Sequence, residues 1–423
     1  MRICTKAVTV PKNELTLGAL KAALRTLRHP VRFVVTESEG RTCSCEVDCL
    51  CETGGYRSAL KSIFDYAPRR FENTDSFNAV LVIPTGIGAE IGGHCGDANA
   101  VARLLASACD TLITHPNVVN AADMNEMTEN TLYVEGSVIS RLLMGVIGLQ
   151  RVRSNRVLLL MDKHREKAFN DGAVNVASTA RVCLGMHCDV LQMDEIAECA
   201  TSYTKAGKAS GEIRRVERIF DTISAYRQQY DAFALTTHVE VSSEMEDEYY
   251  TTTGGVNPWG GIEAMLTHSV ALAFEMPCAH SPMSVSLEES NHTFSHLGII
   301  EPRKASETFS RTYLYCILKG LHRAPRIVQH GGLTVADVSC LLIPDGCIGL
   351  PTLAALEQDI PVIAVKENKN LMRNRLQDLP FKPGKLFIVE NYLEAAGVMT
   401  ALKAGVAPAT VRRPLSGTRV LPG

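Results

Sequence analysis

The chain has 423 residues, a formal net charge of −3, and 46% hydrophobic against 21% charged residues. This composition is typical of a soluble globular protein, and the length predicts two or three domains. The near-neutral charge argues against nucleic acid as a partner, and no apolar run reaches the roughly 18 residues of a membrane helix. The N-terminus lacks the apolar centre of a secretory signal, so we expect a cytoplasmic protein with no membrane partner.

Residues 1–75 predict a small N-terminal α/β domain. Apolar patterns and turn residues indicate, in chain order, a strand over 3–10, a helix over 15–28, paired strands over 31–36 and 42–51, and a helix over 56–66. A charged linker then separates this unit from the rest of the chain.

Four of the fourteen cysteines lie close together in one of these strands. Cys43, Cys45, Cys49 and Cys51 share the spacing of one strand face, because polar residues alternate with them. A reduced cysteine in such a strand acts as a small hydrophobic residue, and we favour this interpretation. Four thiolates would also suit tetrahedral zinc, so a metal site stays as the alternative.

Residues 76–205 predict a first Rossmann-like domain. An apolar strand over 79–83 enters a glycine-rich loop, and Asp97 stands where the N-cap of a helix over 98–109 is expected. Further apolar strands follow over 111–115, 157–161 and 189–193. Strands alternating with helices of this length indicate a parallel sheet covered on both faces.

Residues 206–405 repeat the pattern and predict a second Rossmann-like domain, while residues 406–423 read as a flexible tail. The predicted elements are a charged helix over 212–229, a strand over 233–241, helices over 262–274 and 312–321, a strand over 339–343, a helix over 350–358, strands over 361–365 and 385–389, and a helix over 393–404. The fold class expected is therefore α/β, with two Rossmann-like parallel-sheet units around a cleft and the small N-terminal α/β domain.

The glycine-rich loop is the first candidate site. A strand that leads through glycines to a helix start is a common ligand edge, because free N–H groups and the helix dipole converge there. His94 and Cys95 in this loop could move protons. Substrate contacts are expected from the neighbouring residues Gly86, Gly88, Gly93 and Asp97.

A second turn carries another cysteine. Cys347 follows Asp345 and Gly346 and stands just before a helix, where the positive end of the helix dipole lowers the pKa of a thiol. Two cysteines at the carboxyl edges of two sheet units could face each other across a cleft. Such a pair could take a proton from one face of a carbon acid and return it on the other, without a cofactor.

Polar side chains cluster in other loops at the ends of predicted strands. His115 is a candidate for proton transfer, and Arg323 with Arg326 could hold an anion. The remaining candidates for substrate binding are Asn117, Asn120, Asn257, Trp259, His280, Glu367 and Asn368.

Established cofactor motifs are incomplete in this sequence. The glycine loop does not have the spacing of the dinucleotide fingerprint, there is no Walker A lysine, and the histidines lack zinc-protease spacing. We therefore expect no cofactor, with zinc bound by His94, Cys95 and His115 as an alternative.

Three long motifs resemble an uncharacterised protein family, domain of unknown function 3326: PTGIGAEIGGHCGDANAVARLLASACDTLITHPNVVNAADMNEM, GGVNPWGGIEA and IPDGCIGLPTLAALEQDIPVIAVKENKNLM. The similarity covers about residues 76 to 405, and the family implies no activity. The segment around Cys347 is also similar in layout to the second-cysteine segment of aspartate/glutamate racemases. The same segment is similar to the donor-binding half of two-domain glycosyltransferases and sugar-nucleotide epimerases, which would give Glu357 the role of ribose-binding acid.

The functional expectation is a cofactor-independent enzyme that uses Cys and His chemistry on a small, anionic, carboxylate-bearing metabolite. An isomerase or racemase, a lyase and a hydrolase all fit this description. Two alternatives remain: a nucleotide-sugar enzyme and a non-catalytic metabolite-binding protein. The sequence leaves both a monomer and a homo-oligomer open.

Overall fold

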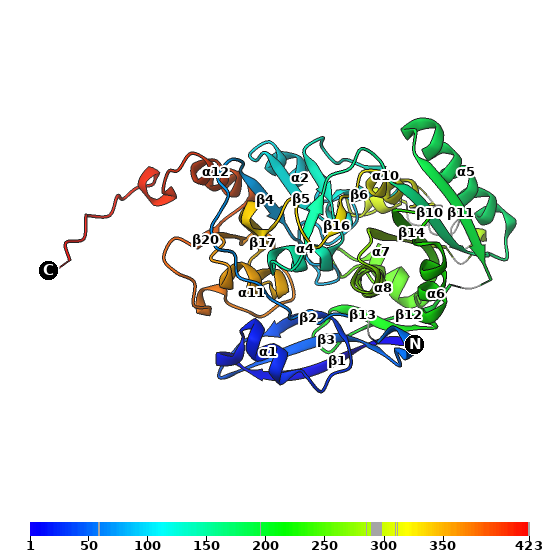
Figure 1. The fold of residues 1–423 in the computed structure, drawn as a ribbon, viewed down its shortest axis with the longest axis horizontal. Coiled ribbons are helices and arrows are strands. Elements are labelled where there is room, and N and C mark those ends of the chain that lie inside the picture. The colour runs from blue at the N-terminus through cyan, green and yellow to red at the C-terminus, as the bar shows by residue number, and fades with distance from the viewer. Residues whose placement is uncertain are drawn as a thin grey trace.

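The computed structural model describes residues 1–57, 60–194, 196–284, 286–288, 298–308, 310 and 312–421. Within these residues the chain forms a mixed α/β fold built on two large sheets, which lie side by side in Figure 1. The described part of the chain contains no helix that combines the length and the apolar character needed to cross a membrane.

The first sheet is wholly parallel, with strand order β20-β19-β17-β4-β5-β8. Its strands are β4 (Asn78–Leu81), β5 (Thr111–Thr114), β8 (Thr131–Tyr133), β17 (Val338–Pro344), β19 (Val362–Val365) and β20 (Leu386–Val389). The strands read as continuous apolar runs because helices cover both faces of the sheet. The covering helices are α2 (Asn99–Ala106), α4 (Gly136–Leu143), α11 (Leu350–Glu357) and α12 (Tyr392–Lys403).

Alternate side chains of the central strand β4 enter two separate hydrophobic cores. Val80 and Val82 lie in the core that also holds apolar residues of α4 and α11. Ala79, Leu81 and Ile83 lie in the core that holds residues of α2 and α12. The sheet is thus sealed on both faces, and only its strand ends are open to a ligand.

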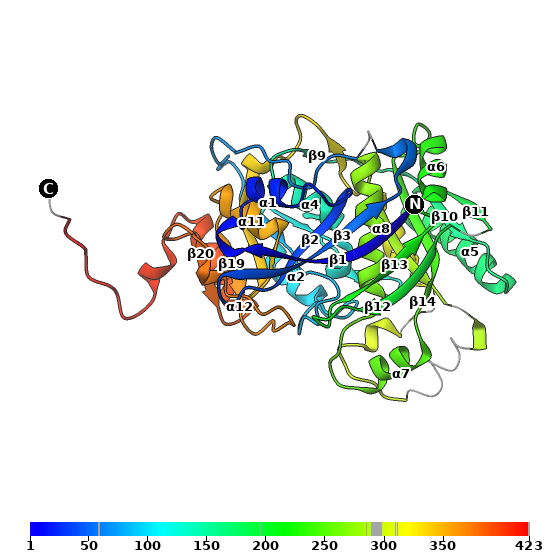
Figure 2. The same cartoon turned by 90° about the horizontal axis from the view of Figure 1, so that it is seen from below.

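The second sheet has the strand order β11-β10-β14-β12-β13-β1-β3-β2-β18, with β15 paired to β14. Its strands are β1 (Arg2–Pro11), β2 (Pro30–Glu37), β3 (Thr42–Cys51), β10 (Arg156–Asp162), β11 (His187–Met193), β12 (Glu198–Tyr203), β13 (Ala209–Arg214), β14 (Ala232–Glu240), β15 (Cys278–Met283) and β18 (Ile348–Gly349). The strands β11, β10, β14 and β15 are parallel to one another, whereas β13, β1, β3 and β2 pair antiparallel. The antiparallel strands lie along the lower edge of the molecule in Figure 1 and cross the face that Figure 2 turns toward the viewer.

The remaining elements surround this sheet. They are the helices α1 (Leu17–Ala23), α3 (Pro116–Val119), α5 (Lys167–Leu184), α6 (Val216–Tyr226), α7 (Ser243–Thr251), α8 (Trp259–Phe274) and α10 (Tyr315–His322), and the short strands β6 (Asn120–Ala121), β7 (Met124–Asn125), β9 (Gly148–Gln150) and β16 (Arg326–Val328). The buried helix α8 packs on β13 and β15, and it lies beside α4 of the other half.

The α/β class and a parallel sheet are confirmed, but the two sheets do not coincide with the domains predicted from the sequence. The expected boundary between residues 205 and 206 falls inside the hairpin of β12 and β13. The parallel sheet combines strands from 78–133 with strands from 338–389, and the N-terminal strands join the second sheet. The sequence gives no sign of these partners, because they are distant along the chain.

Two local predictions need correction, and a third is confirmed. The charged helix expected over 212–229 begins only at Val216, because residues 209–214 form β13. Residues 58–59 of the helix expected over 56–66 lie outside the described part of the chain, and residues 60–66 are not helical. The strand with four cysteines is confirmed as β3, and Cys43, Cys45, Cys49 and Cys51 are all buried and free.

Candidate functional site

A cavity of about 310 Å³ lies where strands of both sheets end. The parallel sheet contributes residues that follow the carboxyl ends of its strands, namely Pro84, His115, Glu135 and Cys347. The second sheet contributes Val241 after β14 and the end of β15 through Ser284, and α8 supplies one wall. Strand ends and loops of this kind are where α/β proteins bind ligands.

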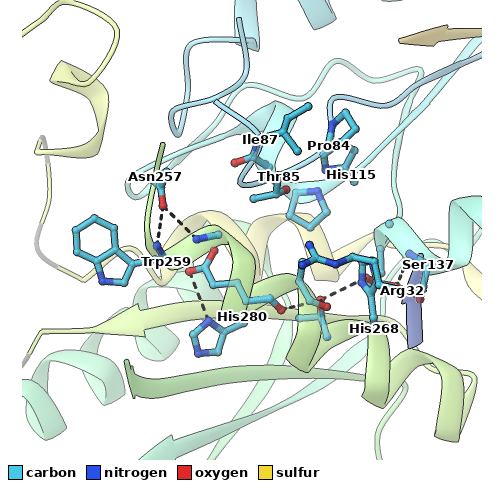
Figure 3. A pocket seen from close by; sticks show the side chains of 18 of the residues that line it. Arg32, Pro84, Thr85, Ile87, His115, Ser137, Asn257, Trp259, His268 and His280 are labelled. Atoms are coloured by element: carbon cyan, nitrogen blue, oxygen red, sulfur yellow. Dashed lines mark hydrogen bonds and ion pairs between the residues drawn. The ribbon is translucent and has the colours of Figure 1, made fainter. Parts of the chain in front are cut away.

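A carboxylate and an imidazole form the most polar part of this cavity. Glu135 precedes α4 and caps it, accepting hydrogen bonds from the backbone N–H groups of Ser137 (2.9 Å) and Val138 (3.3 Å). Its Oε1 atom is in direct contact with Nδ1 of His268 on α8. Figure 3 shows His268 and Ser137 close together at one end of the pocket. Two helices from different halves of the molecule thus hold one acid–base pair.

The charge on Glu135 is stabilised although the side chain is buried. Burial by itself would raise the pKa of this carboxyl group, but the neighbouring His268 and the hydrogen bonds from His268 and Ser137 outweigh it. The pKa of Glu135 is therefore lowered, so this carboxylate is ionised at neutral pH. An ionised carboxylate on Nδ1 fixes the orientation of His268 and leaves its Nε2 atom for a ligand.

His115 lies across the same space and has a different character. Its Nε2 atom accepts a hydrogen bond from the backbone N–H of Ile83 (3.1 Å). Burial lowers the pKa of His115 to about 4. The neutral ring therefore carries its proton on Nδ1, and His115 can donate a hydrogen bond but is a poor base.

Two further groups on the cavity wall extend the polar surface. Nε2 of His280 lies 2.8 Å from the hydroxyl of Thr237, and its Nδ1 lies 3.5 Å from Oε1 of Glu263. Glu263 and His268 come from the same helix, α8, and Figure 3 shows His280 below Trp259 on the side of the cavity away from Ser137.

Both candidate thiols line the cavity, but the surroundings of each favour the protonated thiol over the thiolate. Sγ of Cys95 donates to the carbonyl oxygen of Asn120 (3.2 Å), and Cys347 is only 4% exposed. Burial raises the pKa of both thiols well above the usual range. The expectation that the helix dipole lowers the pKa of Cys347 is wrong, because burial and the nearby Asp345 dominate at this turn.

Glu307 is a cavity residue that organises the loop of Cys95. Its Oε1 accepts hydrogen bonds from the backbone N–H of Cys95 (2.5 Å) and from the side-chain amide of Asn257 (3.0 Å). Its Oε2 accepts from the hydroxyl of Tyr249 (2.9 Å), which in turn contacts Nδ1 of His94 at 2.7 Å. Burial raises the pKa of Glu307 to about 7, within reach of proton transfer at neutral pH.

The structure brings together about half of the residues expected at the site. The predicted residues that line the cavity are Cys95, His115, Asn117, Asn120, Asn257, Trp259, His280 and Cys347. Several of them also hold loops: the amide of Asn117 donates to the carbonyl of Gly92 (2.7 Å), and Oδ1 of Asn257 accepts from the N–H groups of Trp259 and Gly260 (3.0 and 3.1 Å).

The other predicted residues do not line the cavity: Gly86, Gly88, Gly93, His94, Asp97, Asp345, Gly346, Glu367 and Asn368. The glycines allow close packing, because a Cβ atom on Gly86 would lie 2.9 Å from that of Ala209 and one on Gly93 would lie 2.0 Å from the oxygen of Ala89. Asn368 is fully buried and pairs with both backbone groups of Ile91 at 2.9 Å.

Two of these residues also depart from their expected roles. Asp97 does not cap α2, whose N-cap is Ala98. Its Oδ1 atom instead accepts from the backbone N–H of Gly92 (2.6 Å). His94 is 1% exposed, and burial, with Arg303 and Lys304 nearby, lowers its pKa to about 4. His94 therefore supports the loop as a neutral side chain.

Sequence reasoning missed a set of charged cavity residues: Arg32, Glu135, Arg141, Lys208, Glu263, His268 and Glu307. Glu135 could have been found, because it follows the strand β8 directly at the carboxyl edge. His268 gave no signal, because a single histidine in an apolar helix is usually a packing residue. Arg323 and Arg326, expected as an anion clamp, instead form ion pairs with Glu129 and Asp231.

Within the described ranges, His, Cys, Asp and Glu side chains form no group of three or more that could hold a metal ion. The alternative of zinc on His94, Cys95 and His115 therefore gains no support from their placement. Burial raises the pKa of Cys45 and Cys49 to about 12, which keeps both as thiols.

Comparison with known proteins finds a relative in Synechococcus sp. (strain ATCC 27144 / PCC 6301 / SAUG 1402/1), named an uncharacterised lipoprotein. It is 32% identical over 348 residues, which cover 79% of this chain and 93% of the relative. That name corrects the expectation of a cytoplasmic protein, because a lipoprotein is anchored to a membrane through its lipid.

No solved structure gives a significant match to this chain. The family comparison is decisive for identity, since residues 78–412 match the model of a family described as protein of unknown function (DUF3326). This region contains the glycine loop, the candidate cysteines Cys95 and Cys347, and the Glu135–His268 pair. The protein belongs to the DUF3326 family.

Proposed function

We propose that this protein is a cofactor-independent enzyme that carries out acid–base chemistry on a small carboxylate-bearing metabolite in the cavity. Its reaction would be of the isomerase, racemase, lyase or hydrolase type. The observation that carries the proposal is the buried Glu135–His268 pair on the cavity wall. We further propose that the parallel sheet and the parallel strands β11, β10, β14 and β15 of the second sheet act as Rossmann-like halves that close around this cleft.

Each group in the cavity has a distinct role in this proposal. His268 takes a proton at Nε2 from the carbon beside the substrate carboxylate, and Glu135 stabilises the imidazolium ion that forms. His115, neutral with its proton on Nδ1, donates a hydrogen bond to the oxygen that gains negative charge. The proton then returns to the carbon from His268 or from solvent, so no oxidant or reductant is needed.

A two-cysteine mechanism is the second candidate, because Cys95 and Cys347 line the same cavity. It requires a base to deprotonate a thiol whose pKa burial has raised. Under this mechanism, Cys95→Ser and Cys347→Ser would each abolish turnover. Under the His268 mechanism, both variants keep substantial activity.

Hydrogen–deuterium exchange provides the test. The protein is incubated in D₂O with a mixture of small carboxylates, and exchange at carbons next to the carboxylate is followed by NMR. We expect wild-type protein and the control His187→Asn, whose side chain is 59% exposed, to exchange one substrate. His268→Asn and Glu135→Gln should each lower the rate by at least about 100-fold, since one acid–base group typically contributes that much.

Retained exchange in His268→Asn would remove the proposed base. Strong stabilisation by uridine or adenine nucleotides, with no exchange of any carboxylate, would favour a nucleotide-sugar enzyme instead.

A further inference from the structure

The N-terminal strands bury a group of charged side chains against the cavity. Arg32 on β2 stands opposite Asp48 on β3, and Glu46 lies two residues away on the same face of β3. Nε of Arg32 lies 2.5 Å from Oδ2 of Asp48, and Nζ of Lys208, next to β13, lies 3.3 Å from Oε2 of Glu46. The exposed fractions of Asp48 and Lys208 are both 2%.

Stability alone does not explain this group. Buried ion pairs are often no more stabilising than apolar side chains of the same size, because removing charges from water is costly. Burial would raise the pKa of Asp48, but Arg32 and Lys208 outweigh it and lower the pKa, so the carboxylate is charged. Packing alone therefore gives no reason for charged rather than apolar side chains at these positions.

The position of these charges relative to the cavity indicates their role. Arg32 and Lys208 line the cavity, whereas Asp48 and Glu46 do not. The two cations therefore stand at the cavity wall, and their carboxylate partners lie behind them. In Figure 3, Arg32 lies beside His268 and Ser137, with His115 across the same space.

The hydrogen bonds of the arginines are also incomplete. Nε of Arg32 is used by Asp48, but its buried Nη2 atom has no hydrogen-bond partner. Arg141, a second cavity residue that is 4% exposed, likewise uses Nη2 on Glu275 (2.6 Å) and leaves Nη1 without a partner. Unpaired buried donors are costly, so a native protein usually supplies them with an acceptor.

We infer that Arg32, with Lys208 beside it, forms an oxyanion-binding site that holds the carboxylate group of the ligand in the cavity. The inference rests on the proposed function and assigns its substrate class to a particular wall. Arg32 lies outside the matched family region 78–412. The N-terminal strands thus supply ligand recognition to a chemical centre that lies within the family region.

Isothermal titration calorimetry tests the site without requiring turnover. Acetate, malonate, succinate and inorganic phosphate are titrated at constant ionic strength, with neutral succinamide as the uncharged probe. The variants are Arg32→Lys and the double variant Arg32→Gln/Asp48→Asn, which avoids leaving Asp48 as an unpaired buried charge. Arg375→Gln, whose side chain is 77% exposed, is the matched control, and circular dichroism confirms that each variant is folded.

We expect at least one carboxylate to bind the wild type and the control, and succinamide not to bind. The double variant should bind at least tenfold more weakly, and Arg32→Lys should lie between, because lysine keeps the charge but loses the fork of donors. Binding within twofold of wild type in the double variant, or no binding of any anion to wild type, overturns the inference.

The outcomes also separate this inference from the proposed function. Arg32-dependent carboxylate binding without exchange of any carbon would keep the anion site and contradict the enzyme. Arg32-dependent binding of phosphate alone would keep the oxyanion site and contradict a carboxylate substrate. Exchange that is lost in His268→Asn but unchanged in the Arg32 double variant would keep the enzyme and remove the anion site.

Discussion

Asp97 gives a quantitative prediction, because its carboxyl group is held in the protonated form at neutral pH. Oδ1 accepts a hydrogen bond from Gly92, while Oδ2 is buried without a partner. Burial raises the pKa of Asp97 from 3.8 to about 8, and the nearby Glu307 adds to the shift. The native protein therefore keeps this proton at neutral pH, whereas the unfolded chain loses it near pH 4.

The sign of the effect on stability follows from proton binding. Between about pH 4 and pH 8 the native state holds the Asp97 proton more tightly than the unfolded state, so raising the pH favours unfolding. His94 and His115, with pKa values lowered to about 4, act in the opposite direction between pH 4 and 6.5. The effect of the carboxyl groups on stability is therefore best separated from that of the histidines between pH 6.5 and 8.

The magnitude in that interval is measurable. With 1.36 kcal/mol for each unit of pKa shift, Asp97 lowers the free energy of unfolding by about 1.6 kcal/mol between pH 6.5 and 8. Glu307 lowers it by about 0.8 kcal/mol over the same range, and each buried histidine opposes this by about 0.4 kcal/mol.

The variant Asp97→Asn keeps the acceptor for Gly92 and removes the titration. Urea denaturation at pH 6.5, 7.0, 7.5 and 8.0 compares it with wild type and with Asp194→Asn, whose side chain is 95% exposed. The fall in stability should be smaller in Asp97→Asn by about 1.6 kcal/mol and unchanged in the control. Parallel curves for wild type and Asp97→Asn would refute a protonated Asp97.

Two further predictions concern packing and thiol chemistry. Gly93→Ala should lower the free energy of unfolding by about 3 kcal/mol, because its Cβ atom would lie 2.0 Å from the oxygen of Ala89. The control Gly172→Ala, which has open space around it, should not lower the free energy of unfolding. Equal changes in the free energy of unfolding for both variants, measured by urea denaturation, would contradict the close packing at Gly93. Iodoacetamide at pH 8 should modify the exposed Cys183 first and leave Cys95 and Cys347 largely unmodified, because burial raises the pKa of these two thiols. Peptide mass spectrometry showing Cys347 labelled as fast as Cys183 would disprove this protection.

Local elements could be read from the sequence where one pattern dominates. Residues 79–83 and 340–343 are unbroken apolar runs, and they lie in or directly after the strands β4 and β17 of the parallel sheet. The sequence could not show that these two strands pair with each other, because 256 residues (82–337) separate them and each has the same apolar character. Pairing is decided by tertiary packing, which local patterns do not contain.

Part of the candidate site could also be predicted from local patterns in the sequence. Cys95 and Cys347 both line the cavity because each follows a strand of one parallel sheet, and carboxyl ends of parallel strands share an edge. The state of their thiols could not be predicted, since a helix N-terminus is visible in the sequence but burial is not. Desolvation is the larger effect at both positions.

The charged residues of the N-terminal strands could not be predicted as site residues for a different reason. Arg32 belongs to a hairpin whose alternation would place charged residues toward solvent. The structure instead places Arg32 of β2 at the cavity wall and pairs it with the buried Asp48 of β3, which does not line the cavity. Only the packing of the N-terminal strands against the rest of the molecule makes these charges functional candidates.

A crystal structure after soaking with a mixture of small carboxylates tests the central claim most directly. We predict ligand density in the cavity, with the carboxylate within hydrogen-bonding distance of Arg32 and a carbon atom facing Nε2 of His268. Density that contacts neither Arg32 nor the Glu135–His268 pair, or binding only outside the cavity, would contradict both the proposed chemistry and the proposed anion site.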